Sequence, residues 1–109
     1  MSVELKIGTL NLCLGLKHKK DLVKNILYEN KIDILCLQEV EIESGFDLVN
    51  LGIPGFCLEV EKNSIKSRTA ICIQNGVKYQ RKQDLEGEDA RVVIVELNNG
   101  KKIINIYRK

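Results

Sequence analysis

The chain opens with a stretch in which apolar and polar residues alternate. Over residues 3–11 the apolar positions recur at every second residue, at Val3, Leu5 and Ile7. A period of two residues is typical of a β-strand that buries one face. We therefore expect a first strand that ends near Asn11.

The period then changes to that of a helix. After a loop that contains Gly15, the apolar residues between Leu22 and Leu27 form one stripe, which predicts an amphipathic helix over about residues 19–30. Residues 32–37 are almost continuously apolar, as in a short strand covered on both faces. A strand, a helix and a buried strand make a βαβ unit, whose right-handed crossover leaves the two strands parallel. Both strands should end at the same edge of one sheet.

The second half of the chain carries closely spaced strand signals. Residues 41–55 contain three glycines and the only proline, and they predict a loop with one short helical turn. Asn75-Gly76 and Asn98-Asn99-Gly100 are hairpin signals. The predicted strands of this half cover residues 56–60, 69–74, 77–80, 91–97 and 102–107. We expect an antiparallel meander that belongs to the same α/β unit.

The composition is that of an ordinary globular protein. With 109 residues, 44% of them apolar and 29% charged, the chain suits one domain with a small core. The net charge of +2 neither supports nor excludes a nucleic-acid partner, although Lys17, Lys19 and Lys20 form one local cluster. The start does not resemble a signal peptide, and no apolar run is long enough to cross a bilayer. We expect an intracellular protein of the nucleus or cytoplasm with no membrane partner.

The cysteines and the single histidine do not predict a zinc site. No two cysteines are close enough in sequence for a C-x-x-C pair, and His18 is expected to face solvent. We expect the cysteines to be free thiols that pack as small hydrophobic residues: Cys13, Cys36, Cys57 and Cys72. Four acidic side chains are expected to face water: Glu41, Glu43, Glu59 and Glu61.

The ends of the two parallel strands hold the candidates for chemistry. Ligands of open α/β sheets bind beyond the carboxyl ends of the parallel strands, which here end in Asn11 and Glu39. Adjacent strands lie about 4.8 Å apart, so an amide oxygen and a carboxylate can converge on one small site. Magnesium prefers oxygen ligands and often takes one or two protein carboxylates with substrate phosphate. A carboxylate after a buried strand can also be only the solvated start of a loop, and the spacing alone leaves that alternative open.

The sequence around Asn11 and Glu39 favours the interpretation as metal ligands. One stretch of the chain is similar to the opening segment of the endonuclease/exonuclease/phosphatase family: TLNLCLGLKHKKDLVKNILYENKIDILCLQEVEI. In the family, this opening segment ends in a strand of the form Asp-Ile-Leu-x-Leu-Gln-Glu. The matching residues are Thr9, Asn11, Gly15, Leu16, Lys20, Asp33, Ile34, Leu35, Leu37, Gln38 and Glu39. The segment that opens at Arg68 and the strands that end at Tyr107 resemble later parts of the same family, most closely the nuclease domains of non-LTR retrotransposons.

This resemblance implies a fold and a set of site residues. Residues 1–109 would be a partial domain, the N-terminal half of a DNase I-like four-layer α/β sandwich made of a βαβ unit and an antiparallel strand meander. The family's metal-binding glutamate falls on Glu39, its active-site asparagine on Asn11 and its phosphate-contacting tyrosine on Tyr107. The implied cofactor is Mg²⁺ or Mn²⁺, with both Glu39 and Asn11 as metal ligands. A metal contact at Cys13 is in doubt, because family members have an acidic or small residue there.

The resemblance also implies what these residues lack. The family's Asp-x-Asn pair and its Ser-Asp-His segment have no counterpart before Lys109. The complete form is expected to be a metal-dependent endonuclease that hydrolyses DNA phosphodiester bonds, whereas this chain alone should show little turnover. The resemblance implies DNA as a partner. Half of the sandwich would leave one sheet face bare, so we also expect the C-terminal half of the domain or a second copy of the chain to pack on the exposed sheet.

Two other interpretations compete with this one. A non-catalytic remnant that serves as a folding or binding module would show no response to metal. A small nucleotide-binding α/β domain has no support, because neither G-x-G-x-x-G nor G-x-x-x-x-G-K-[ST] occurs in the chain.

Overall fold

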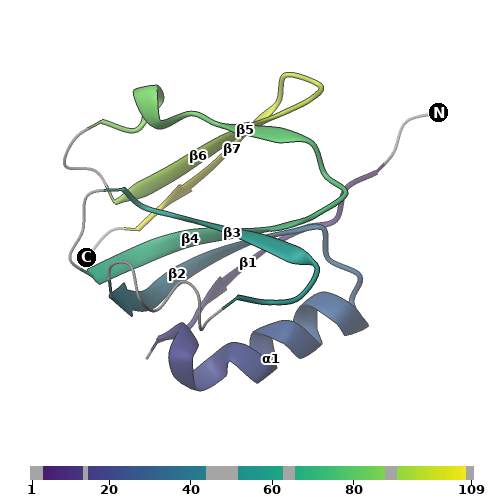
Figure 1. Ribbon diagram of the computed structural model, residues 1–109, viewed down its shortest axis with the longest axis vertical. Coiled ribbons are helices and arrows are strands. Elements are labelled where there is room, and N and C mark those ends of the chain that lie inside the picture. The colour runs from purple at the N-terminus through teal and green to yellow at the C-terminus, as the bar shows by residue number, and fades with distance from the viewer. Residues whose placement is uncertain (1–3, 14, 44–51, 63–65, 88–90, 108–109) are drawn as a thin grey trace.

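The computed structural model describes residues 4–13, 15–43, 52–62, 66–87 and 91–107, and these form three layers (Figure 1). A helix covers one face of a four-stranded sheet, and a three-stranded sheet covers the other face. The elements follow the chain as β1 (Ile7–Asn11), α1 (Leu16–Glu29), β2 (Ile34–Glu43), β3 (Phe56–Val60), β4 (Lys66–Gln74), β5 (Tyr79–Arg81), the 3-10 turn η1 (Gln83–Leu85), β6 (Val92–Leu97) and β7 (Lys102–Ile106).

The first sheet has the strand order β1-β2-β4-β3. Strands β1 and β2 are parallel and are joined by α1, which confirms the predicted βαβ unit, while β4 is antiparallel to both β2 and β3. The core between α1 and this sheet is aliphatic apart from one thiol: Leu12, Leu16, Val23, Leu27, Leu35, Leu37, Val40, Ile42, Ile53, Ala70 and Cys72. Burying these side chains is the main force that holds the helix on the sheet.

The second sheet has the order β5-β6-β7 and is antiparallel throughout. It packs on the opposite face of β2 and β4 through a second core: Ile34, Cys36, Ile71, Ile73, Val93, Val95 and Leu97. The two central strands β2 and β4 are therefore buried on both faces. This double burial is the physical reason for the continuous apolar run that predicted β2.

The expected single meander is wrong in one respect. Asn75 and Gly76 do form a turn, with the Val77 N–H donating to the Gln74 carbonyl at 3.0 Å, but β5 pairs with β6 and not with β4. Both edges of β4 are already occupied by β2 and β3, so the turn carries the chain into the second sheet. The hairpin predicted at residues 98–100 is present between β6 and β7.

Element bounds differ from the predicted ones mainly at β1, β2 and α1. Strand β1 begins at Ile7 and not at Val3, and strand β2 continues to Glu43, past the expected end at Glu39. Helix α1 begins at Leu16 and contains a non-helical residue, Lys19, whose ammonium group donates to the Leu12 carbonyl at 2.6 Å. The expected helical turn within residues 41–55 falls largely outside the described residues. No helix in the described ranges is long and apolar enough to cross a membrane.

The cysteines divide into two classes, so the expectation of four buried thiols is half wrong. Cys36 and Cys72 are buried between the layers, and Cys13 and Cys57 are exposed. Burial raises the pKa of the Cys36 thiol to about 11 and that of Cys72 to about 12. Because thiolates are the reactive species, the two buried thiols should react slowly: reagents cannot reach them, and they stay protonated at neutral pH.

A thiol-specific reagent should therefore distinguish the two classes. We expect rapid modification of Cys13 and Cys57 in the folded protein at neutral pH, and modification of Cys36 and Cys72 only after unfolding in denaturant. Mass spectrometry of the labelled peptides gives the assignment. Equal labelling rates at Cys36 and Cys57 under native conditions would contradict the burial of Cys36.

Candidate functional site

The strand register places Glu39 directly after the last pair of the parallel ladder, in which Asn11, the final residue of β1, is opposite Gln38 of β2. Asn11 is the parallel-ladder partner of Gln38, and the following Leu12 N–H donates to the Gln38 carbonyl at 3.0 Å. The Asn11 Oδ1 accepts the Cys13 N–H at 2.9 Å, a local turn that fixes the amide oxygen at the strand end. A carboxamide oxygen has two lone pairs, so this oxygen retains one for another donor or a cation.

A β-bulge sets the position of Glu39. Between the pairs Gln38–Thr69 and Ile42–Ser67, β2 has three residues where β4 has only Arg68. The irregularity coincides with left-handed backbone at Glu39 (φ 57°) and Glu41 (φ 52°), a conformation that costs energy for a residue with a side chain.

The consequence of the bulge is seen in the core. Leu37 and Val40 are an odd number of residues apart, yet both side chains lie in the core beneath α1. In a regular strand they would face opposite sides of the sheet, and Glu39 would take the inward position. The bulge therefore keeps the Glu39 carboxylate out of the core. Within the described ranges this carboxylate has no hydrogen-bond or ion-pair partner.

Gly15 packs directly against this bulge. It has φ 98°, and a Cβ at this position would lie 3.2 Å from the Glu41 Cβ and 3.3 Å from the Val40 carbonyl oxygen. Positive φ and close approach together favour glycine. The Gly-Leu loop of the sequence motif is thus the support on which the bulge rests.

Tyr107 lies at the same end of the sheets. It directly follows β7, and its N–H donates to the Arg91 carbonyl at 2.9 Å. Its ring centroid lies 5.9 Å from the Arg68 Cζ, and the Arg68 Nε is 3.4 Å from a carboxylate oxygen of Glu41. A chain of contacts therefore joins the tyrosine to the bulge that carries Glu39.

Asn105 is a site residue that the sequence did not reveal. Its side chain is buried between the sheets, and its Nδ2 donates to the carbonyls of Leu37 at 3.0 Å and Ala70 at 2.8 Å. Its Oδ1 accepts the Gln38 Nε2 at 2.7 Å, and Gln38 also donates to the Thr9 hydroxyl at 3.1 Å. The residue before Glu39 is thereby anchored to both sheets. The available signal was a polar residue among the isoleucines of β7.

Three of the acidic residues expected to face water, Glu41, Glu59 and Glu61, are in fact paired with arginines. Glu61 is buried and accepts the Arg68 N–H at 2.8 Å and the Arg91 Nη1 at 2.9 Å. Glu59 accepts the Tyr79 hydroxyl at 2.6 Å and pairs with Arg81 at 3.1 Å. The expectation was wrong because the second sheet brings basic and phenolic groups over β3, which a local pattern cannot show.

These contacts raise the pKa of the Tyr79 hydroxyl, first through burial and then through the hydrogen bond and negative charge of Glu59. A phenol held next to a carboxylate in a half-buried site keeps its proton. The Tyr79–Glu59 pair is therefore a structural link between the two sheets.

Solved structures share this architecture, whereas no protein-family model and no curated protein matches the chain in sequence. The endonuclease domain of TRAS1, a telomere-specific non-LTR retrotransposon, matches with a TM-score of 0.68 and 14% identity over 96% of this chain and 46% of that one. An AP endonuclease from Archaeoglobus fulgidus matches with a TM-score of 0.63 and 24% identity over 95% of this chain and 41% of that one.

A third match is the 3′ phosphatase NExo from Neisseria bound to a product DNA hairpin, with a TM-score of 0.65 and 23% identity over 95% of this chain and 41% of that one. The chain has the fold of part of an endonuclease/exonuclease/phosphatase domain. This confirms the resemblance and the fold class inferred from the sequence. The chain spans 41–46% of the length of these three nucleases, so it matches less than half of each.

Within this fold, the donor set of Asn11 and Glu39 suits a hard cation in part. A carboxylate without a described partner and an amide oxygen with a spare lone pair are ligands that Mg²⁺ accepts alongside water. No cluster of three or more His, Cys, Asp or Glu side chains that could hold a metal occurs among the residues described.

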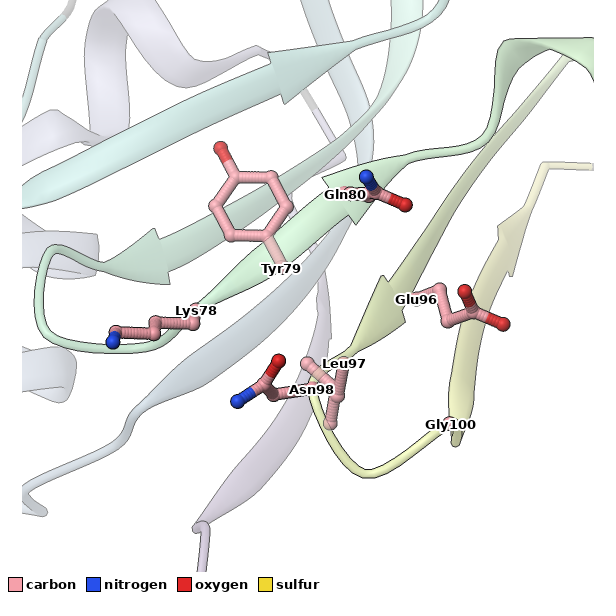
Figure 2. A pocket seen from close by; sticks show the side chains of 7 residues that line it. All are labelled: Lys78, Tyr79, Gln80, Glu96, Leu97, Asn98 and Gly100. Atoms are coloured by element: carbon pink, nitrogen blue, oxygen red, sulfur yellow. The ribbon is translucent and has the colours of Figure 1, made fainter.

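The open cavity of about 340 Å³ shown in Figure 2 lies elsewhere in the nuclease fold. It is lined by Lys78, Tyr79, Gln80, Glu96, Leu97, Asn98 and Gly100. Tyr79 and Leu97 belong to the core that surrounds Ile34, at the start of β2, so the cavity lies away from the strand end that carries Glu39. It contains none of the predicted site residues.

Proposed function

We propose that the chain is part of a metal-dependent phosphodiesterase that hydrolyses DNA, with Glu39 and Asn11 as ligands of Mg²⁺ or Mn²⁺. The observation that carries this proposal is the β-bulge in β2, which sets the Glu39 carboxylate outside the core, one residue after the Gln38 that pairs with Asn11. Strained backbone and β-bulges cluster at functional sites.

Each residue has a distinct part in the proposed site. A bound divalent cation would supply Lewis-acid polarisation of a phosphoryl oxygen. Glu39 contributes the negative charge that holds the cation, and Asn11 contributes a neutral oxygen oriented by its own turn. Tyr107 donates its hydroxyl proton in a hydrogen bond to a phosphate oxygen. The hydroxyl has no hydrogen-bond partner in the described part of the chain, which leaves it available for this role.

DNA is the proposed substrate, and these residues alone are expected to turn it over slowly or not at all. One of the matched nucleases is bound to a product DNA hairpin, which supports nucleic acid as the partner. The groups that would activate water and assist the leaving oxygen correspond to the Asp-x-Asn and Ser-Asp-His segments, which are absent from the sequence.

Thermal unfolding with and without magnesium tests the metal site without requiring turnover. At a Mg²⁺ concentration ten times the dissociation constant, binding to the folded state alone adds about 1.4 kcal/mol. For a domain of this size that corresponds to a rise of about 5 °C in the melting temperature. We expect this rise in the unsubstituted protein and its loss in Glu39→Gln.

The matched control is Glu29→Gln, which removes a carboxylate from the exposed end of α1. It should retain the full magnesium response. A melting temperature that is unchanged by millimolar Mg²⁺ in the unsubstituted protein would contradict the metal site and favour a non-catalytic folding or binding module.

A further inference from the structure

Arg68 occupies a distinctive position next to the proposed metal site. It is the single β4 residue opposite the three residues of the β2 bulge. Its backbone N–H donates to the buried Glu61 carboxylate at 2.8 Å, which fixes the main chain at this point. The start of its side chain is therefore held in a constant place relative to Glu39.

The guanidinium of Arg68 makes two contacts with different chemistry. Its Nε lies 3.4 Å from the Glu41 carboxylate, and its Cζ lies 5.9 Å from the centroid of the Tyr107 ring. A planar, delocalised cation can pair with a carboxylate at its edge and attract an aromatic ring at its face. A lysine would provide the charge without the plane.

These contacts join the two halves of the proposed site. Glu41 is the second left-handed residue of the bulge, so its ion pair with Arg68 places the guanidinium beside the bulge that carries Glu39. Tyr107 belongs to the other sheet and directly follows Ile106, the last residue of β7 that pairs with β6. The ring contact with Arg68 therefore limits where the phenol can lie.

We infer that Arg68 is a positioning residue that holds the Tyr107 hydroxyl beside the cation bound at Glu39. The inference rests on the proposed function, because the position of the Tyr107 hydroxyl matters only if a cation binds at Glu39. Arg68 itself acts through Glu41 and Tyr107 and needs no contact with the substrate. Its loss should leave cation binding at Glu39 and move the tyrosine.

The test uses NMR of the full chain with isotope-labelled tyrosine rings. The protein has three tyrosines, and Tyr107→Phe identifies the signal of the one concerned. Without metal, Arg68→Met should shift the Tyr107 ring signals and leave those of Tyr28 and Tyr79 in place. Arg68→Lys should shift them in the same direction by less, and it provides a second variant if the first does not fold.

Paramagnetic Mn²⁺ then reports the position of the ring relative to the metal. In the unsubstituted protein we expect Mn²⁺ to broaden both the Val40 amide and the Tyr107 ring signals, and Glu39→Gln to abolish both effects. In Arg68→Met the Val40 broadening should persist while most of the Tyr107 broadening is lost. Lys101→Met, which removes an exposed cation from the β6–β7 turn, is the control and should leave both unchanged.

The outcomes separate the two proposals. Tyr107 signals that neither shift nor lose broadening in a folded Arg68 variant would overturn the positioning role while the metal site stands. Absence of broadening at Val40 in the unsubstituted protein would contradict the metal site at Glu39, and with it the purpose assigned to Arg68.

Discussion

Replacing Glu86 by alanine is expected to lower the free energy of unfolding by about 3–5 kcal/mol, because it leaves a partly buried arginine without its main partner. The Glu86 side chain is fully buried and forms a two-point ion pair with Arg81, at 2.6 and 2.9 Å. The same carboxylate accepts the Ile94 N–H at 2.9 Å. Since small domains are stable by only about 5–15 kcal/mol, this loss would be a large part of the total.

Urea unfolding followed by circular dichroism gives the change in free energy. Glu96→Ala is the matched control, because Glu96 pairs with Lys82 at 3.8 Å and Lys102 at 3.1 Å but is partly exposed. Exposed pairs of this kind contribute about 0–1 kcal/mol. Equal losses in the two variants would show that burial of the Glu86 pair does not determine its contribution.

The second large effect is expected at Asn105. Asn105→Ala removes the donor that satisfies the Leu37 and Ala70 carbonyls and the acceptor of the Gln38 amide. Each buried polar group left unsatisfied costs about 1–3 kcal/mol, so the free energy of unfolding should fall by about 3 kcal/mol or more. Asn105→Asp should be worse, since it sets carboxylate oxygens against two carbonyl oxygens.

The control for Asn105 is Asn99→Ala in the exposed β6–β7 turn, where the side chain accepts only the Lys101 N–H at 3.0 Å. We expect it to cost less than half as much in the same urea experiment. A smaller effect at position 105 than at position 99 would mean that the inter-sheet hydrogen bonds are replaced by water or by relaxation of the sheets.

The sequence was sufficient to predict the first half of the fold. The change from a period of two to a helical stripe and then to a continuous apolar run is local, and it predicts β1, α1 and β2 in order. The right-handed crossover then requires β1 and β2 to be parallel. Asn11 and Glu39 emerged as neighbours from that step alone, although their role as metal ligands stays a prediction.

The local sequence pattern could not predict the features that shape the site. The bulge at residues 39–41 arises because the core under α1 accepts Val40 and not Glu39, which depends on how three layers fit together. The Arg91 partner of Glu61 and the carbonyl partners of Asn105 lie at least thirty residues away along the chain. A single sequence shows which residues are polar but not which distant cation or carbonyl will meet them.

The most direct measurement of the central claim is a magnesium titration followed by amide NMR shifts. We expect the largest shifts at residues 11–13 and 38–41, saturating together, and we expect them to disappear in Glu39→Gln and to persist in Glu29→Gln. Shifts that are uniformly small, or that centre on another carboxylate such as Glu96, would contradict a metal site at the ends of β1 and β2.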